Sequence, residues 1–214
     1  MTMRRYFSRD VAGKLGYFVN RRIFKLQNEY TKRDGGTPES RAALARLRRD
    51  LDGGAPAWMT VGSDLFEGWG RSLPSGEEDP AAVRAARAAM ELYACHQQSR
   101  RHGVAQDAKD ADKIRMTFGR ACRLIDPDME HAKGVRRRLS AAEAAPDFNG
   151  VVRSVRALIM LMRSAGDGTI TLDYRSLAQD LYQIQFPEAC SEVFQRWSMD
   201  YYSGTGATTQ RHDA

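Results

Sequence analysis

Apolar residues recur along this chain at the three- and four-residue spacing of an amphipathic helix, and this spacing restricts the fold more than any other feature. Val151, Val155, Leu158 and Met162, for example, stand at positions i, i+4, i+7 and i+11. No alternating apolar and polar pattern of useful length occurs, so a half-buried strand is not expected. We therefore predict an all-α fold, a helical bundle of about eight to nine helices.

Glycine, proline and capping residues divide this pattern into segments. Gly35 and Gly36 end a first helix, and Thr37 is placed to cap the helix that begins at Pro38. Asp79, Asp126, Asp147 and Asp173 stand in the same way at the starts of later helices. Six predicted helices span about 9–33, 38–51, 80–98, 112–125, 174–185 and 187–202. Two more begin at 126 and 147; the first carries residues 136–138 and the second includes 151–162. The Gly- and Pro-rich segment 53–78 is expected to hold one short helix, anchored by Trp58, Phe66 and Trp69.

We expect these helices to form two lobes. The N-terminal helical lobe covers residues 1–105 and the C-terminal helical lobe covers 106–203, with the polar run 99–110 as a mobile loop between them. Residues 204–214 have few apolar side chains to bury and are predicted to be a disordered tail.

The formal net charge of +6 is distributed in alternating blocks. Residues 1–49 carry a net charge of +9 and residues 113–163 carry +6, whereas 50–112 carry −5 and 164–214 carry −4. If folding brings the two basic blocks onto one face, that face would attract a polyanion. Only six of the 33 basic residues are lysines, and the planar guanidinium of arginine matches phosphate geometry well. The charge pattern therefore favours nucleic acid as the partner.

Helical projection indicates which basic residues can face a ligand. In the segment 112–125, Lys113, Arg120 and Arg123 fall on the side opposite the apolar residues, so one face can pack while the other binds. In the segment 38–51, Arg46 and Arg49 point away from the leucine stripe, and Arg41 and Arg48 flank it.

Residue patterns typical of enzymes are absent from the sequence. It contains no GxxxxGK[ST], GxGxxG, HExxH or GxSxG motif. Cys95, Cys122 and Cys190 stand far apart without CxxC spacing, and His96 beside Cys95 would point about 100° away from it on a helix. We expect no catalytic residue, no metal site and no cofactor. The longest apolar run is six residues, so we predict a cytoplasmic protein without a membrane partner.

Five segments in a fixed order resemble the CasB family, the small subunit of the type I-E CRISPR surveillance complex Cascade. They are RAALARLRR (41–49), FGRACRL (118–124), GVRRRL (134–139), LDYRSLAQDLYQIQFPEA (172–189) and RWSMDYY (196–202). The chain departs from the family at Ile184, where a tryptophan is common, and the segments before Arg9 and from 53 to 78 match nothing in it.

The resemblance implies a helical, non-catalytic protein of antiviral defence that is present as two copies along Cascade. Its partners would be double- and single-stranded DNA, the hybrid of guide RNA and target DNA, the other Cascade subunits and a second copy of itself. It would steady the hybrid and the displaced strand of the R-loop without reading bases. The nucleic-acid-binding residues matched to the family by position are Arg48, Arg49, Arg120, Arg137, Arg138 and Arg156. From their helical faces we add Arg41, Lys113 and Arg123.

Two other functions have to be weighed. A helical transcriptional regulator would need a helix-turn-helix. The nearest candidate turn, 124–129, fits poorly, because Met129, Glu130 and His131 stand where base-reading side chains belong. A scaffold that binds only proteins would show no salt-dependent affinity for DNA. The acidic stretches 50–112 and 164–214 are hypothesised to dock on other subunits.

Overall fold

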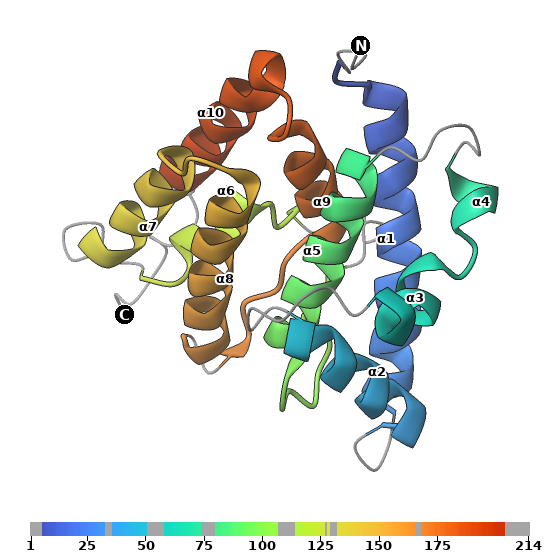
Figure 1. The fold of residues 1–214 in the computed structure, drawn as a ribbon. Helices are drawn as coiled ribbons and strands as arrows, with labels where there is room; N and C mark the ends of the chain where they lie inside the picture. The colour runs from blue at the N-terminus through green and yellow to red at the C-terminus, as the bar shows by residue number, and fades with distance from the viewer. Residues whose placement is uncertain are drawn as a thin grey trace, which may run out of the picture.

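The structure is a computed structural model that describes residues 6–32, 36–50, 58–73, 80–106, 114–126, 128, 132–165 and 168–203. These residues form helices joined by short connections, so the predicted all-α class is confirmed (Figure 1). The helices are α1 (Arg9–Tyr30), α2 (Pro38–Asp50), α3 (Trp58–Phe66), α4 (Trp69–Ser72), α5 (Pro80–Gln97), α6 (Phe118–Arg123), α7 (Lys133–Glu143), α8 (Phe148–Ser164), α9 (Tyr174–Gln183) and α10 (Pro187–Ser203).

Several helices begin at the residues whose chemistry predicts a cap. The Asp147 carboxylate accepts a hydrogen bond from the Gly150 amide at 2.7 Å, and the Asp173 carboxylate accepts one from Ser176 at 3.0 Å. The Thr37 hydroxyl accepts the Ser40 amide at 3.1 Å. Each cap satisfies an amide that the first helical turn leaves without an acceptor. Asp79 and the predicted tail 204–214 lie outside the described residues.

The helix predicted over 112–125 is wrong in length, because α6 covers only Phe118–Arg123. Residues 114–117 cross the fold in a non-helical conformation: the Met116 amide donates to the Gln106 side chain, and the Met116 carbonyl accepts from the Asp173 amide at 2.8 Å. Ile114 is consequently exposed instead of packed. Contacts with residues distant in sequence have overridden the local helical pattern here.

The segment predicted as a mobile loop, 99–110, is held in place over its described part. Ala105 forms a parallel bridge with Leu172, and the side-chain amide of Gln27 both accepts from the Ala105 amide at 2.8 Å and donates to its carbonyl at 3.1 Å. Val104 is fully buried. Residues 104–106 therefore belong to the packed structure.

The segment 58–73 contains two short helices, α3 and α4, held by the aromatic residues that were predicted to anchor it. The rings of Trp58, Phe66 and Trp69 follow one another with centroids 6.2 Å and 5.6 Å apart, and Trp69 meets Phe18 of α1 edge to face at 5.1 Å. Such pairs add to the stabilisation that apolar burial gives. The remainder of 53–78 lies outside the described residues.

Helix α5 occupies the centre of the bundle, and nearly all of its faces are covered. It packs against α1, α2, α8 and α9. Its buried positions are dominated by alanine, whose small side chain lets neighbouring helices approach closely. α9 belongs to the predicted C-terminal lobe, yet it lies against α1 and α5 of the predicted N-terminal lobe. The division into two lobes stays a prediction.

His96 on α5 is a fully buried titratable group whose Nδ1 lies 3.1 Å from the Tyr174 hydroxyl. Burial, together with the positive charge of Arg100, lowers the pKa of His96 to about 4. Its pKa in the unfolded chain is about 6.5, so below that pH the unfolded state binds more protons and folding becomes less favourable.

We predict that the free energy of unfolding falls by about 3 kcal/mol through this group as pH decreases from 6.5 to 4. Urea denaturation across that range measures the fall. His96→Gln should remove most of it, whereas His102→Gln, at an exposed histidine, should leave it in place. An equal fall in the His96→Gln protein would show that this imidazole does not carry the effect.

Candidate nucleic-acid interface

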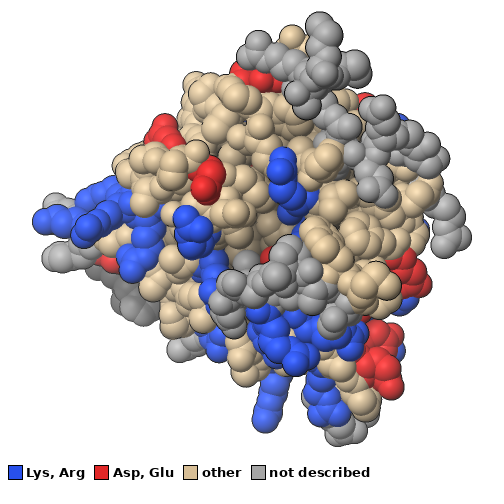
Figure 2. Space-filling model, in the orientation of Figure 1, with Lys and Arg blue, Asp and Glu red and all other residues tan. Residues whose placement is uncertain are grey.

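The predicted binding residues lie on four helices. Arg41, Arg48 and Arg49 are on α2, Arg120 and Arg123 on α6, Arg137 and Arg138 on α7, and Arg156 on α8; Lys113 lies outside the described residues. The packing of α2 on α5, α5 on α8 and α8 on α7 connects three of these helices. Figure 2 shows that lysine and arginine side chains gather on one face over α7, over α8 and along the side where α2 lies. We call the basic side chains of α2, α7 and α8 on this side the basic face.

On α2, an apolar stripe orients the arginines toward solvent. Leu44 and Leu47 are fully buried, which turns Arg41 and Arg49 outward and leaves Arg48 half-buried at the edge. Arg48 and Arg49 stand in the last turn, where the helix dipole favours positive charge. Within the described part of the chain, none of these three guanidiniums has an acidic partner.

Helix α7 presents its arginines in the same manner. Val135 and Ala142 are buried, and Arg137 and Arg138 are exposed. Arg138 donates one hydrogen bond to the Gly134 carbonyl at 3.0 Å, which occupies one of the five N–H groups of the guanidinium. Arg137 has no acidic partner among the residues described. These side chains keep donors available for an external anion.

Three further arginines near the basic face were not predicted from the sequence. Arg153 is exposed on α8, three residues before Arg156 and so on the same side of the helix. Arg100 donates to the Arg163 carbonyl, and Arg163 donates to the Gln98 side chain at 2.9 Å. The last two join the end of α5 to the end of α8. Arg153 could have been found by extending the helical-face argument to α8.

The α6 arginines have partners inside the fold, although this side of the segment was expected to be free for binding. Arg120 Nε lies 3.4 Å from Oδ1 of Asp200 on α10, and its Nη1 donates to the Arg115 carbonyl at 3.0 Å. Arg123 donates to the Asp126 carbonyl at 3.0 Å. Their assignment to the interface stays a prediction, and it is weaker than that of the basic face.

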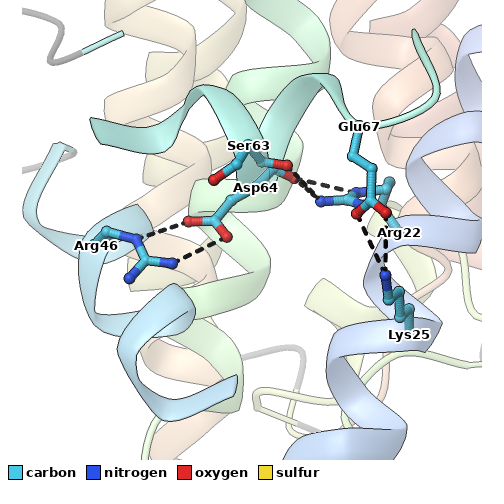
Figure 3. A network of polar contacts seen from close by, with 6 residues as sticks. All are labelled: Arg22, Lys25, Arg46, Ser63, Asp64 and Glu67. Carbon is cyan, nitrogen blue, oxygen red and sulfur yellow. Dashed lines mark hydrogen bonds and ion pairs between the residues drawn. The ribbon is translucent and has the colours of Figure 1, made fainter. Parts of the chain in front are cut away.

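Other cations of the basic N-terminal block hold helices together (Figure 3). Arg22 is buried and donates to the Asp64 carbonyl at 2.5 and 3.1 Å, to the Ser63 carbonyl at 2.9 Å and to Glu67. Arg46 forms a two-pronged ion pair with the Asp64 carboxylate at 2.9 and 3.1 Å, and this hydrogen bonding raises the pKa of Arg46. Hydrogen bonds from Arg22 and then Lys25 lower the pKa of Glu67. These residues fix α3 against α1 and α2.

Two features of the described residues bear on metal binding and reactivity. No cluster of three or more His, Cys, Asp or Glu side chains suited to a metal ion occurs there. Burial raises the pKa of the Cys122 thiol, and the buried carboxyl of Asp180, whose pKa burial also raises, accepts hydrogen bonds from Trp197 and Arg196. In the same residues, every helix is too short or too polar to cross a membrane.

The two kinds of arginine predict different effects on stability. Arg22→Met should lower the free energy of unfolding by about 2–3 kcal/mol, because buried carbonyls of α3 lose their donors. Arg48→Ala/Arg49→Ala should change it by less than about 1 kcal/mol, since these side chains have no charged partner among the described residues and lose only their interaction with the C-terminal end of the α2 dipole. Urea denaturation of both proteins tests the distinction. Comparable losses in the two variants would contradict it.

The architecture and the sequence are both similar to known proteins. A family model described as CRISPR-associated protein Cse2 matches residues 43–202. The crystal structure of CasB from Thermobifida fusca aligns with a TM-score of 0.72 at 27% identity, covering 88% of this chain and 98% of that one. CasB from Thermus thermophilus aligns with a TM-score of 0.62 at 20% identity over 88% and 97% of the two chains. M. ruber CasB aligns with a TM-score of 0.57 at 23% identity over 85% and 93%. No curated protein matches the sequence.

Proposed function

Because the chain belongs to the Cse2/CasB family of CRISPR-associated proteins, we propose that it acts as the small subunit of type I-E Cascade and grips polynucleotide backbone through its basic face. The observation that carries this proposal is the set of solvent-facing arginines on α2 and α7 that have no acidic partner among the described residues. An arginine that is not neutralised inside the fold can replace the counterions of a phosphate.

The chemistry of the basic face suits backbone contact without base reading. A guanidinium can donate two parallel hydrogen bonds to one phosphate, which fixes position as well as supplying energy. The arginines come from separate helices, so they can follow a strand and do not form a single reading element in a groove. In RNA-guided recognition, base pairing reads sequence while protein contributes shape and backbone contacts.

In this role the subunit would stabilise the guide–target hybrid and the displaced DNA strand. A second copy of the chain and the other Cascade subunits would extend the contact surface along the complex. A non-catalytic role is supported by the positions of the carboxylates, several of which cap helices, such as Asp147 and Asp173, or pair with arginines, such as Asp64 and Asp200. Those four carboxylates therefore stabilise the fold through helix caps and ion pairs.

The connection between α6 and α7 argues against a transcriptional regulator. α6 ends at Arg123 and α7 begins at Lys133, so nine residues separate them. A DNA-binding helix-turn-helix joins its two helices by a turn of about three to four residues. Met129, Glu130 and His131, which stand where base-reading side chains would be needed, lie outside the described residues. Enrichment of one DNA sequence by the purified chain would support the regulator instead.

Removing charge from both ends of the basic face should weaken DNA retention by the assembled complex. Arg49→Gln/Arg137→Gln removes two exposed guanidiniums, and the slope of log affinity against log salt concentration should become shallower by about 1.4–1.8. Affinity should fall by a similar factor for different target sequences, each with its matching guide, because phosphates carry no sequence information. Filter binding at several salt concentrations measures both effects.

A matched control removes the same charge elsewhere. Lys25→Gln/Lys32→Gln neutralises two exposed cations of the same chain that are already paired with Glu67 and Glu29. This protein should retain target DNA with the wild-type salt slope. If the two double variants behave alike, the basic face is not the binding surface.

A further inference from the structure

A second basic surface lies outside the basic face, in a groove between α1 and α9. The groove has a volume of about 780 Å³. Six of its lining residues come from α1 and one comes from α9: Arg9, Asp10, Gly13, Lys14, Tyr17, Arg21 and Arg175. Helix α1 precedes the segment 43–202 that the Cse2 family model matches, whereas Arg175 on α9 lies within that segment.

Three guanidiniums in the groove are not neutralised within the described fold. Lys14 is paired with Asp10 at 2.6 Å. Arg9, Arg21 and Arg175 have no acidic partner among the described residues. Asp10, the only carboxylate among the described residues that line the groove, is therefore paired with Lys14, and the charges of the three arginines can attract an anion.

Four residues of α1 form an inclined row along the groove. Arg9, Gly13, Tyr17 and Arg21 follow at intervals of four, so neighbours in the row are adjacent and the row turns through about 120° around the helix. Arg9 and Arg21 are separated by about 18 Å of helix axis at a rise of about 1.5 Å per residue. That length corresponds to about five nucleotides of a stacked strand at about 3.4 Å each. A ligand that contacts both Arg9 and Arg21 is therefore extended and carries more than one anionic group.

Glycines set the depth of the groove and the position of its far wall. A Cβ atom added to Gly13 would meet nothing within 4 Å, so the row is open between Arg9 and Tyr17. A Cβ atom at Gly16 would lie 2.8 Å from the Gln179 side chain and 2.9 Å from the Arg175 carbonyl. The missing side chain at Gly16 lets α9 pack directly on α1, which brings Arg175 beside the row.

Tyr17 indicates which polyanion fits. Its side chain is 57% exposed in the wall of the groove, between the cations. An exposed aromatic ring among arginines is the combination that binds single-stranded nucleic acid, because the ring stacks on a base while guanidiniums hold the phosphates. A duplex keeps the faces of its bases stacked on one another, and an acidic peptide would satisfy the arginines but leave the ring without a partner.

We propose that this groove binds a short stretch of single-stranded nucleic acid, with Arg9, Arg21 and Arg175 on phosphates and Tyr17 stacked on a base. This proposal extends the proposed function and rests on it for one point only, that the partner of the protein is a nucleic acid. It gives the subunit two separate surfaces for polynucleotides. A single strand in the groove does not require occupancy of the basic face.

The test uses the full chain with a fluorescein-labelled 15-nucleotide oligo(dT) and fluorescence anisotropy. Tyr17→Ala should weaken binding about thirtyfold, the middle of the range for loss of one stacked base. Tyr202→Ala removes a ring of similar exposure from α10 and should leave binding unchanged. Arg9→Gln/Arg21→Gln should reduce the salt slope by about 1.4, whereas Lys25→Gln/Lys32→Gln should not change it. Photocrosslinking with 5-iodouracil in the oligonucleotide should label Tyr17.

The outcomes separate this inference from the proposed function. If Tyr17→Ala and Arg9→Gln/Arg21→Gln bind oligo(dT) as the wild type does, or if the wild type does not bind it, the groove is not such a site, whatever the basic-face variant does in the complex. If the groove variants lose oligo(dT) while Arg49→Gln/Arg137→Gln retains target DNA, the groove site stands and the basic-face assignment fails. If the arginine variant loses polyglutamate as strongly as oligo(dT) and Tyr17→Ala affects neither, the groove binds acidic protein and the proposal is overturned.

Discussion

Close packing around the alanine-rich helix α5 is the constraint on which the rest of the structure depends. Its small buried side chains let α1, α2, α8 and α9 approach from different sides. This arrangement connects α2 to α8 and, through α8, to α7, so arginines more than a hundred residues apart come to share one face (Figures 1 and 2). A bulkier residue at the fully buried Ala85 or Ala89 would separate these helices and disperse the charge.

Partners inside the fold decide which cations can act on a ligand. Arg22 and Arg46 use their hydrogen-bonding groups on α3 and serve stability (Figure 3). Arg49 and Arg137 have no such partner among the described residues, so their charge is directed to solvent. The net charge alone overestimates how many cations can bind a ligand, because it counts paired and unpaired arginines equally. Because Arg120 pairs with Asp200 inside the fold, we do not count it among the residues of the basic face.

Local features of the fold could be predicted from the sequence, because periodicity and caps act over a few residues. The caps at Asp147 and Asp173 and the helix from Pro187 are examples. The short α6 could not be predicted, since its N-terminal flank is held by Gln106 and Asp173. Nor could the partner of Arg46, 18 residues away, or the groove that Arg175 shares with α1. Contacts between distant segments leave no periodic signal in a single sequence.

We propose that solvent-facing arginines of the basic face contact polynucleotide phosphates in the assembled complex. Phenylglyoxal modification of arginines, quantified by mass spectrometry with and without bound target DNA, measures this contact. We expect Arg49 and Arg137 to react in the free complex and to be protected by DNA, while buried Arg22 reacts in neither state. Equal reactivity of Arg49 and Arg137 in the presence and absence of DNA would contradict it.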